Sequence, residues 1–323
     1  MATDRRGFEP VAADTSLLDL IQGGQPGRFS GYLLTAPRPA IVEPGSTRDV
    51  PVWLEALDRI GLPRSEVAFV VVTHIHLDHG GGAGTLMREL PAATLVVHPS
   101  GARHLVDPSR LIQGSRAVFG ERLDRLFGLP EPVPEGRIAA VEAGDTLDLG
   151  GGRRLRFIDG RGHARHHHMI LDEGTGMLFS GDELGVRYLP ACRPGRDYLL
   201  PSTVPNQFDP EAMLASLRRV RALRPDGVLF SHFGRLQSPL DTLLDRIEEQ
   251  VHAYAALLGP PSSPVSVEEV QERLERHIHA DLDAQGLERT PELAAVLALD
   301  IEVCAIGLAD YHARRLAAQA GGR

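Results

Sequence analysis

Lysine is absent from this 323-residue chain, cysteine occurs only twice and tryptophan once. The two cysteines, Cys192 and Cys304, are too few and too far apart for a disulfide framework, and their scarcity fits a reducing compartment. All the basic side chains are arginines, and the net charge of −9 argues against a surface that binds a polyanion. The composition therefore makes a nucleic-acid partner a poor expectation.

Targeting signals and membrane-spanning segments are also lacking. Residues 1–14 have no apolar core or cleavage site of a secretory signal, so we expect a loose N-terminal arm. The most apolar late segment, residues 293–308, is interrupted by Asp300 and Glu302 and is too short to span a bilayer. We expect a soluble, cytoplasmic protein with no membrane partner.

One short motif carries most of the chemical information. His74-Ile75-His76-Leu77-Asp78-His79 places three imidazoles and a carboxylate together, and Gly80-Gly81-Gly82 follows. The preceding residues 68–73 are apolar and mostly β-branched without alternation, which predicts a strand buried on both faces. The motif therefore lies on a loop at the carboxyl end of a core strand, where open sheets carry their chemistry.

This H-x-H-x-D-H motif resembles that of the metallo-β-lactamase superfamily, and the resemblance extends over residues 15–235. His163, Asp182 and His232 follow in the family's order, each at or just beyond the end of an apolar run. The implied fold is α/β, an αβ/βα four-layer sandwich. Residues 1–235 are then the catalytic domain, and residues 236–323 are a helical C-terminal extension.

The resemblance implies a binuclear metal centre with seven ligands. One ion is held by His74, His76 and His163, the second by Asp78, His79 and His232, and Asp182 bridges the two. Imidazole and carboxylate without thiolate suit zinc, with iron and manganese as alternatives.

The loop that contains His163 offers other imidazoles. His163 directly follows Gly162 and matches the first histidine of the family pattern Gly-His-Thr-x-Gly-His, while Ala164 and His166 stand where that pattern has Thr and Gly. We expect His163 to be the ligand. Two alternative roles remain for His166, His167 and His168: they orient the ligands by hydrogen bonds, or they face the substrate.

The resemblance implies a metal-dependent hydrolase in which a hydroxide between two ions attacks the carbonyl of an ester, thioester or lactone. Asp78 and Asp182 are the catalytic carboxylates, and Asp78 also passes a proton to the leaving group. The alternatives are a phosphodiesterase and a di-iron redox or oxygen-binding protein, although the latter usually carries Glu at the position of His76. The resemblance also implies that a hydrolase specific for glutathione would use lysine to bind it, so the absence of lysine argues against glutathione as part of the small-molecule substrate.

Helical signals dominate the last part of the chain. Apolar residues recur at helical spacing from 240 to 254, Ser266 begins a second helix, and Thr290-Pro291 begins a third. Packing against the sandwich, substrate binding and homodimer formation are the alternatives for this extension. Earlier in the chain, we expect a helix at residues 110–127 with breaks at Gly114 and Gly120, and a rim loop at residues 184–205. The arginines and tyrosines of this loop have two alternative roles: contact with a carboxylate or phosphate of the substrate, or solubility at the surface.

Overall fold

The computed structural model describes residues 7–260 and 263–321, which belong to two compact units. The first unit runs up to Asp159 and includes His166–Gly181 and Pro225–Arg235. The second unit comprises Gly160–Arg165, Asp182–Arg224 and Leu236–Arg323. The C-terminal helices thus share a unit with two inner segments, and the domain boundary expected at residue 235 stays a prediction.

The first sheet of unit 1 follows the order of the chain. Its strands β1 to β4 are antiparallel to their neighbours, whereas β4, β5, β6 and β7 are parallel. The central strands are apolar and buried at every position of β4 and β5, as expected for a sheet covered on both faces. The seven strands are β1 (Glu9–Ala12), β2 (Thr15–Asp19), β3 (Ser30–Leu34), β4 (Ala40–Val42), β5 (Phe69–Val71), β6 (Thr94–Val97) and β7 (Ile138–Ala140).

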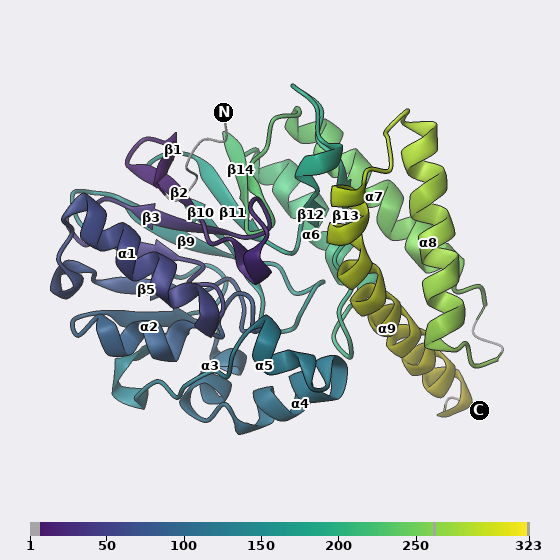
Figure 1. Cartoon of the computed structure of the whole chain (residues 1–323), viewed down its shortest axis with the longest axis horizontal. Coiled ribbons are helices and arrows are strands. Elements are labelled where there is room, and N and C mark those ends of the chain that lie inside the picture. Colours follow the sequence, from purple (N-terminus) through teal and green to yellow (C-terminus); the bar gives the residue numbers. More distant parts are fainter. Residues whose placement is uncertain (1–6, 261–262, 322–323) are drawn as a thin grey trace. The chain divides into compact units, whose positions relative to one another are not determined.

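Helices cover this sheet on one side. Trp53 and Leu57 of α1 and Leu86 of α2 are buried in one cluster with sheet residues such as Val70, and Figure 1 shows α1 and α2 beside β3 and β5. The buried positions of α1 recur at helical spacing, which is why this segment forms an amphipathic helix. The helices of this unit are α1 (Val50–Ile60), α2 (Ala83–Glu89), α3 (Pro99–Val106), α4 (Ser109–Phe119) and α5 (Arg122–Leu126).

The second sheet has the order β15-β14-β11-β10-β9-β8, in which only β11 and β14 are parallel to each other. The two sheets meet at Tyr32 of β3. Its ring packs edge-on against Phe179 of β11 at a centroid distance of 5.2 Å, and its hydroxyl donates to the backbone oxygen of Phe230. The strands are β8 (Thr146–Asp148), β9 (Arg154–Asp159), β10 (His168–Asp172), β11 (Met177–Gly181), β14 (Gly227–Phe230) and β15 (Gly234–Arg235).

Unit 2 is mainly helical. Helices α8 and α9 pack along each other, α7 contacts both α6 and α8, and the hairpin of β12 and β13 lies against α7. Ser266 and Thr290 cap α8 and α9 by accepting backbone amides in the first turn, as the sequence predicts. Its elements are β12 (Val186–Arg187), β13 (Leu199–Leu200), α6 (Pro210–Leu223), α7 (Leu240–Leu257), α8 (Val267–Ala284) and α9 (Pro291–Gly321).

The predicted α/β architecture with two sheets, flanking helices and a helical C-terminal region is confirmed. Three local predictions are wrong. Residues 9–12 of the expected loose arm form β1, α4 continues through Gly114, and the rim loop contains β12 and β13. Residues 1–6 of that arm lie outside the described residues. Within residues 7–260 and 263–321, no helix combines the length and hydropathy needed to cross a membrane.

Candidate metal centre

The predicted ligands follow the carboxyl ends of buried strands. In unit 1, Thr73 and His74 come soon after β5, and Ser231 and His232 directly follow β14. In unit 2, Asp182 is the first residue after β11. Five of the seven predicted ligands therefore belong to unit 1, and His163 and Asp182 belong to unit 2.

Asp78, His79 and His232 form a compact cluster in unit 1, with one potential ligand atom from each within 4.8 Å of the others. Asp78 Oδ2 lies 3.4 Å from His232 Nε2 and 3.8 Å from His79 Nε2. Two atoms that are each about 2.1 Å from a tetrahedral ion are about 3.4 Å apart. The cluster therefore fits three ligands of one divalent ion.

The proton positions on these histidines also suit a metal. His232 Nδ1 lies 3.0 Å from the backbone oxygen of Arg28, which can only accept, so Nδ1 carries the proton and Nε2 carries the lone pair. His79 Nδ1 donates to the Glu43 carboxylate in the same way. In the neutral form of either ring, Nε2 is therefore the nitrogen that faces Asp78 with a lone pair, as imidazole does when it binds metals.

Glu43 is a functional residue that the sequence analysis missed. Its fully buried carboxylate accepts hydrogen bonds from His79 Nδ1, from the Thr73 amide at 2.7 Å and from the Ser231 hydroxyl at 3.0 Å. It thus ties the motif loop to the segment that carries His232. The available signal was an acidic residue placed directly after the apolar strand 40–42.

His74 and His76 lie beside this cluster. Their rings are nearly perpendicular with centroids 4.5 Å apart, and the His74 ring lies 3.9 Å from that of His79. His74 is fully buried and its Nδ1 hydrogen-bonds Thr73 Oγ1 at 3.0 Å. The motif thus gathers all its imidazoles at one end of β5.

His163 and Asp182 are brought together within unit 2. His163 Nε2 lies 3.6 Å from Asp182 Oδ2, and His163 Nδ1 donates to the Ser202 backbone oxygen at 3.0 Å. His163 therefore has the same tautomer as His232 and His79. The Glu183 carboxylate accepts the backbone amides of Gly162 and His163 at 3.0 and 2.9 Å, which fixes the start of this loop. Glu183 and Ser202 were not predicted, because an isolated Glu or Ser forms no spacing pattern.

The three histidines at 166–168 differ from one another. The rings of His166 and His167 lie 6.0 and 4.8 Å from that of His74. His168 instead lies in β10, where its Nε2 donates to the Val72 backbone oxygen at 2.9 Å. Burial lowers the pKa of His168 to about 3, against the raising effect of that hydrogen bond. His168 is therefore a neutral structural histidine, whereas His166 and His167 line the metal-ligand cluster.

Gly181 explains how His167 can approach. A Cβ at this position would lie 2.3 Å from His167 Nε2 and 2.7 Å from Thr73 Oγ1. Its φ of +52° also falls in the left-handed region that favours glycine. A side chain at residue 181 would therefore displace His167 or the motif loop.

Two residues of the predicted substrate-binding rim have structural partners instead. The Arg187 guanidinium pairs with Asp197 at 2.5 Å, and the Tyr188 hydroxyl donates to Asp300 at 2.8 Å. Asp197 also accepts the backbone amides of Gln237 and Ser238, each at 2.7 Å. Arg187 and Tyr188 therefore hold the hairpin and α9 together within unit 2.

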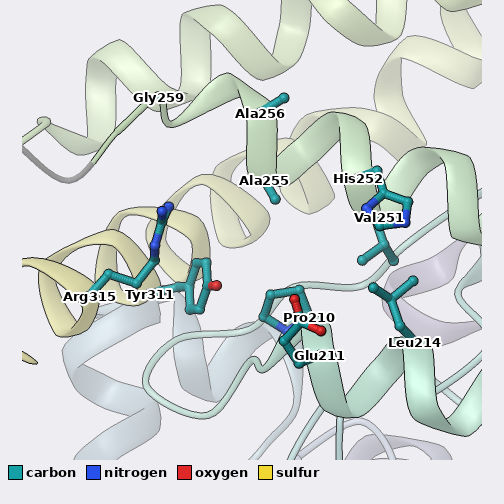
Figure 2. A pocket seen from close by; sticks show the side chains of 10 residues that line it. All are labelled: Pro210, Glu211, Leu214, Val251, His252, Ala255, Ala256, Gly259, Tyr311 and Arg315. Carbon is teal, nitrogen blue, oxygen red and sulfur yellow. The ribbon is translucent and has the colours of Figure 1, made fainter.

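Unit 2 also contains a cavity of about 340 Å³. Figure 2 shows Tyr311 and Arg315 of α9 on one side of it, Pro210 and Glu211 of α6 on another, and His252 of α7 above. None of the residues that line this cavity is a predicted metal ligand. It is therefore a feature separate from the candidate metal centre.

The sequence model of the metallo-beta-lactamase superfamily matches residues 32–232, and the chain belongs to this superfamily. The match begins in β3 and ends at His232, so it covers the whole predicted ligand set. The superfamily implies divalent metal binding, which agrees with the cluster of Asp78, His79 and His232.

Several proteins resemble the chain. The metallo-beta-lactamase fold-containing protein ST1585 of Sulfurisphaera tokodaii is 30% identical over 57% of this chain and 69% of its own length. A hydroxyacylglutathione hydrolase of Cupriavidus taiwanensis is 29% identical over 71% of this chain and 74% of its own length. An anaerobic nitric oxide reductase flavorubredoxin of Salmonella arizonae is 22% identical over 50% of this chain but only 29% of its own length.

The fold has solved counterparts as well. The crystal structure of ST1585 from Sulfolobus tokodaii matches with a TM-score of 0.62 and 22% identity, over 88% of this chain and 93% of the other. This likeness concerns the fold and includes most of the helical C-terminal region. The predicted membership of the superfamily is thereby confirmed.

Proposed function

We propose that the chain is a binuclear metal-dependent hydrolase that acts on the carbonyl of an ester, thioester or lactone. The observation that carries this proposal is the arrangement of Asp78 and His232. Their potential ligand atoms are 3.4 Å apart, and the opposite nitrogen of His232 is committed to a backbone oxygen. The two atoms are thus spaced and oriented as two ligands of one cation would be.

As the superfamily pattern implies, His74, His76 and His163 would hold one ion, Asp78, His79 and His232 would hold the other, and Asp182 would contribute to both. When bound, two such ions would lower the pKa of water far enough for hydroxide to be available at neutral pH. Zinc suits this donor set, with iron and manganese as alternatives.

The chain's own residues then orient the reaction. Glu43 and the Arg28 carbonyl fix the tautomers of His79 and His232, and the Ser202 carbonyl fixes that of His163. Asp78, whose side chain is 25% exposed, is accessible enough to accept a proton and pass it to the leaving group. Asp182 is nearly buried and acts mainly as a ligand.

The carbonyl substrate is favoured by the likeness to hydroxyacylglutathione hydrolase over most of both chains. The absence of lysine points away from glutathione as the thiol part. A phosphodiester is the second candidate, because two ions also stabilise an in-line displacement at phosphorus. A redox function is the third candidate, supported by partial likenesses such as that to flavorubredoxin.

A panel of p-nitrophenyl esters, lactones, thioesters and bis-p-nitrophenyl phosphate, tested with the metal-loaded full chain, distinguishes these functions. We expect turnover of a carbonyl substrate at a rate well above that of the phosphodiester. Asp78→Asn should lower kcat about 100-fold or more, since general acid–base groups contribute roughly 10²–10⁴-fold. Asp107→Asn, which changes an exposed aspartate bonded only locally to Ser109, is the matched control. Hydrolysis of the phosphodiester alone, or a redox-active iron centre without hydrolysis, would contradict the proposal.

A further inference from the structure

Ser202, which follows β13 by two residues, contacts both predicted metal ligands of unit 2. Its carbonyl accepts from His163 Nδ1 at 3.0 Å, and its hydroxyl lies 3.3 Å from Asp182 Oδ2, to which it donates. One residue therefore fixes the tautomer of His163 and the direction of the Asp182 carboxylate. Neither contact requires a residue from the other unit.

Helix α9 contacts residues 201–203, the segment that contains Ser202. Thr203 Oγ1 donates to the Cys304 backbone oxygen at 3.0 Å, and the Thr203 amide lies 3.5 Å from Cys304 Sγ. The same sulfur lies 3.9 Å from the Pro201 backbone oxygen. Thr203 is fully buried and Cys304 is 8% exposed, so water cannot easily replace these contacts.

Gly307, about one helical turn after Cys304, sets how closely the segment approaches the helix. A Cβ at this position would lie 2.4 Å from the Thr203 backbone oxygen and 2.7 Å from the Val204 carbonyl carbon. Backbone atoms cannot give way as a flexible side chain can. Glycine inside a helix is less stabilising than alanine, and this close approach accounts for its presence here.

We infer that α9 is part of the metal-binding apparatus, with Ser202 as a positioning residue for His163 and Asp182. The contacts of Cys304 and Gly307 with residues 201–204 fix where Ser202 lies. This inference rests on the proposed metal centre. It gives the helical extension a role other than the packing, substrate binding and dimerisation that its sequence suggests. Groups that hydrogen-bond to metal ligands typically change metal affinity about 10–100-fold.

The test compares metal affinities of full-length variants. Metal-free protein is titrated with zinc against a chromophoric chelator, and circular dichroism and Tm of the metal-free protein report the fold. Ser202→Ala removes the hydroxyl and keeps the carbonyl. Gly307→Ala places a methyl group against the backbone of residues 203–204 and should displace the segment 201–204 from α9. Gly114→Ala is the matched control, because Gly114 also lies inside a helix but a Cβ there would meet nothing within 4 Å.

We expect Ser202→Ala and Gly307→Ala each to weaken the binding of at least one ion by about 10–100-fold, with Ser202→Thr restoring it. Gly114→Ala should bind both ions as the wild type does. Wild-type affinities for both ions in a folded Ser202→Ala variant would overturn the inference and leave the metal centre intact. If Gly307→Ala does not fold, Thr203→Val, which removes the hydroxyl that donates to the Cys304 backbone oxygen on α9, takes its place and should also weaken the binding of at least one ion. Wild-type affinities in a folded Thr203→Val variant would overturn the role of α9. A wild-type chain that binds no metal would instead remove the proposed function, and the inference with it.

Discussion

The Glu43 carboxylate and the His79 Nδ1 form a buried hydrogen bond in which both side chains are almost completely excluded from water. The same carboxylate accepts the Thr73 amide and the Ser231 hydroxyl. A single acidic side chain therefore determines the tautomer of one predicted ligand and joins the loops that follow β5 and β14.

Glu43→Gln should weaken metal binding and destabilise the fold. The amide nitrogen would face a donor, and a buried donor left unsatisfied costs about 1–3 kcal/mol. We expect about 10–100-fold lower metal affinity, measured by chelator competition, and a lower free energy of unfolding of the metal-free protein, measured with urea. Exposed Glu55→Gln, which breaks only a pair with Arg59 one helical turn away, should change neither quantity appreciably. Unchanged metal affinity in Glu43→Gln would show that His79 needs no such partner.

His163→Ala and His167→Ala should have different effects on metal content. His163 Nε2 lies 3.6 Å from Asp182 Oδ2, and its Nδ1 is held by Ser202, so its loss should empty one metal position. His167 packs beside His74 at a ring distance of 4.8 Å, and its loss should retain most of the metal while lowering activity only partly. Paired metal titrations that give the reverse ranking would show that the ligand of this loop is misassigned.

His168 should make the metal-free protein less stable in acid. Burial lowers its pKa in the folded protein to about 3, whereas the ordinary pKa of histidine is 6.5. As the pH falls below 6.5, the unfolded chain takes up a proton at His168 that the folded chain does not take up until about pH 3. Stability should therefore fall through this window by at most about 1.4 kcal/mol per pH unit from this residue.

The measurement for this prediction is the free energy of unfolding of the metal-free chain, determined at evenly spaced pH values between about 4 and about 7, the range in which histidine of the unfolded chain titrates. His168→Gln should show a shallower dependence on pH than the wild type, because one titrating group is removed. Parallel curves for the wild type and His168→Gln would mean that His168 titrates alike in both states.

The sequence predicts the part of the site that is local in the chain. The motif at residues 74–79 and the strand before it lie together, and the apolar runs before Asp182 and His232 are strands as expected. Polar residues that directly follow a buried strand can be placed from the sequence, because they must lie at the edge of the sheet where the strands end.

The partners of the ligands could not be predicted in this way. Glu43 reaches His79 across 36 positions, and Ser202 reaches Asp182 across 20, so only the folded sheet order brings these atoms together. At Gly114 the sequence predicts a break in the helix that the structure does not have. A lone exposed glycine lowers helix stability by only about 1 kcal/mol, and α4 continues through it.

Metal content together with turnover tests the central claim most directly. The metal-free full-length chain is titrated with zinc, and bound metal by mass analysis is followed alongside hydrolysis of the best ester, thioester or lactone. The account predicts that activity appears with metal, reaches its maximum at two ions per chain, and is lost together with metal occupancy in Asp182→Ala. Full hydrolytic activity in the metal-free chain, or two-ion occupancy in Asp182→Ala equal to the wild type, would contradict it.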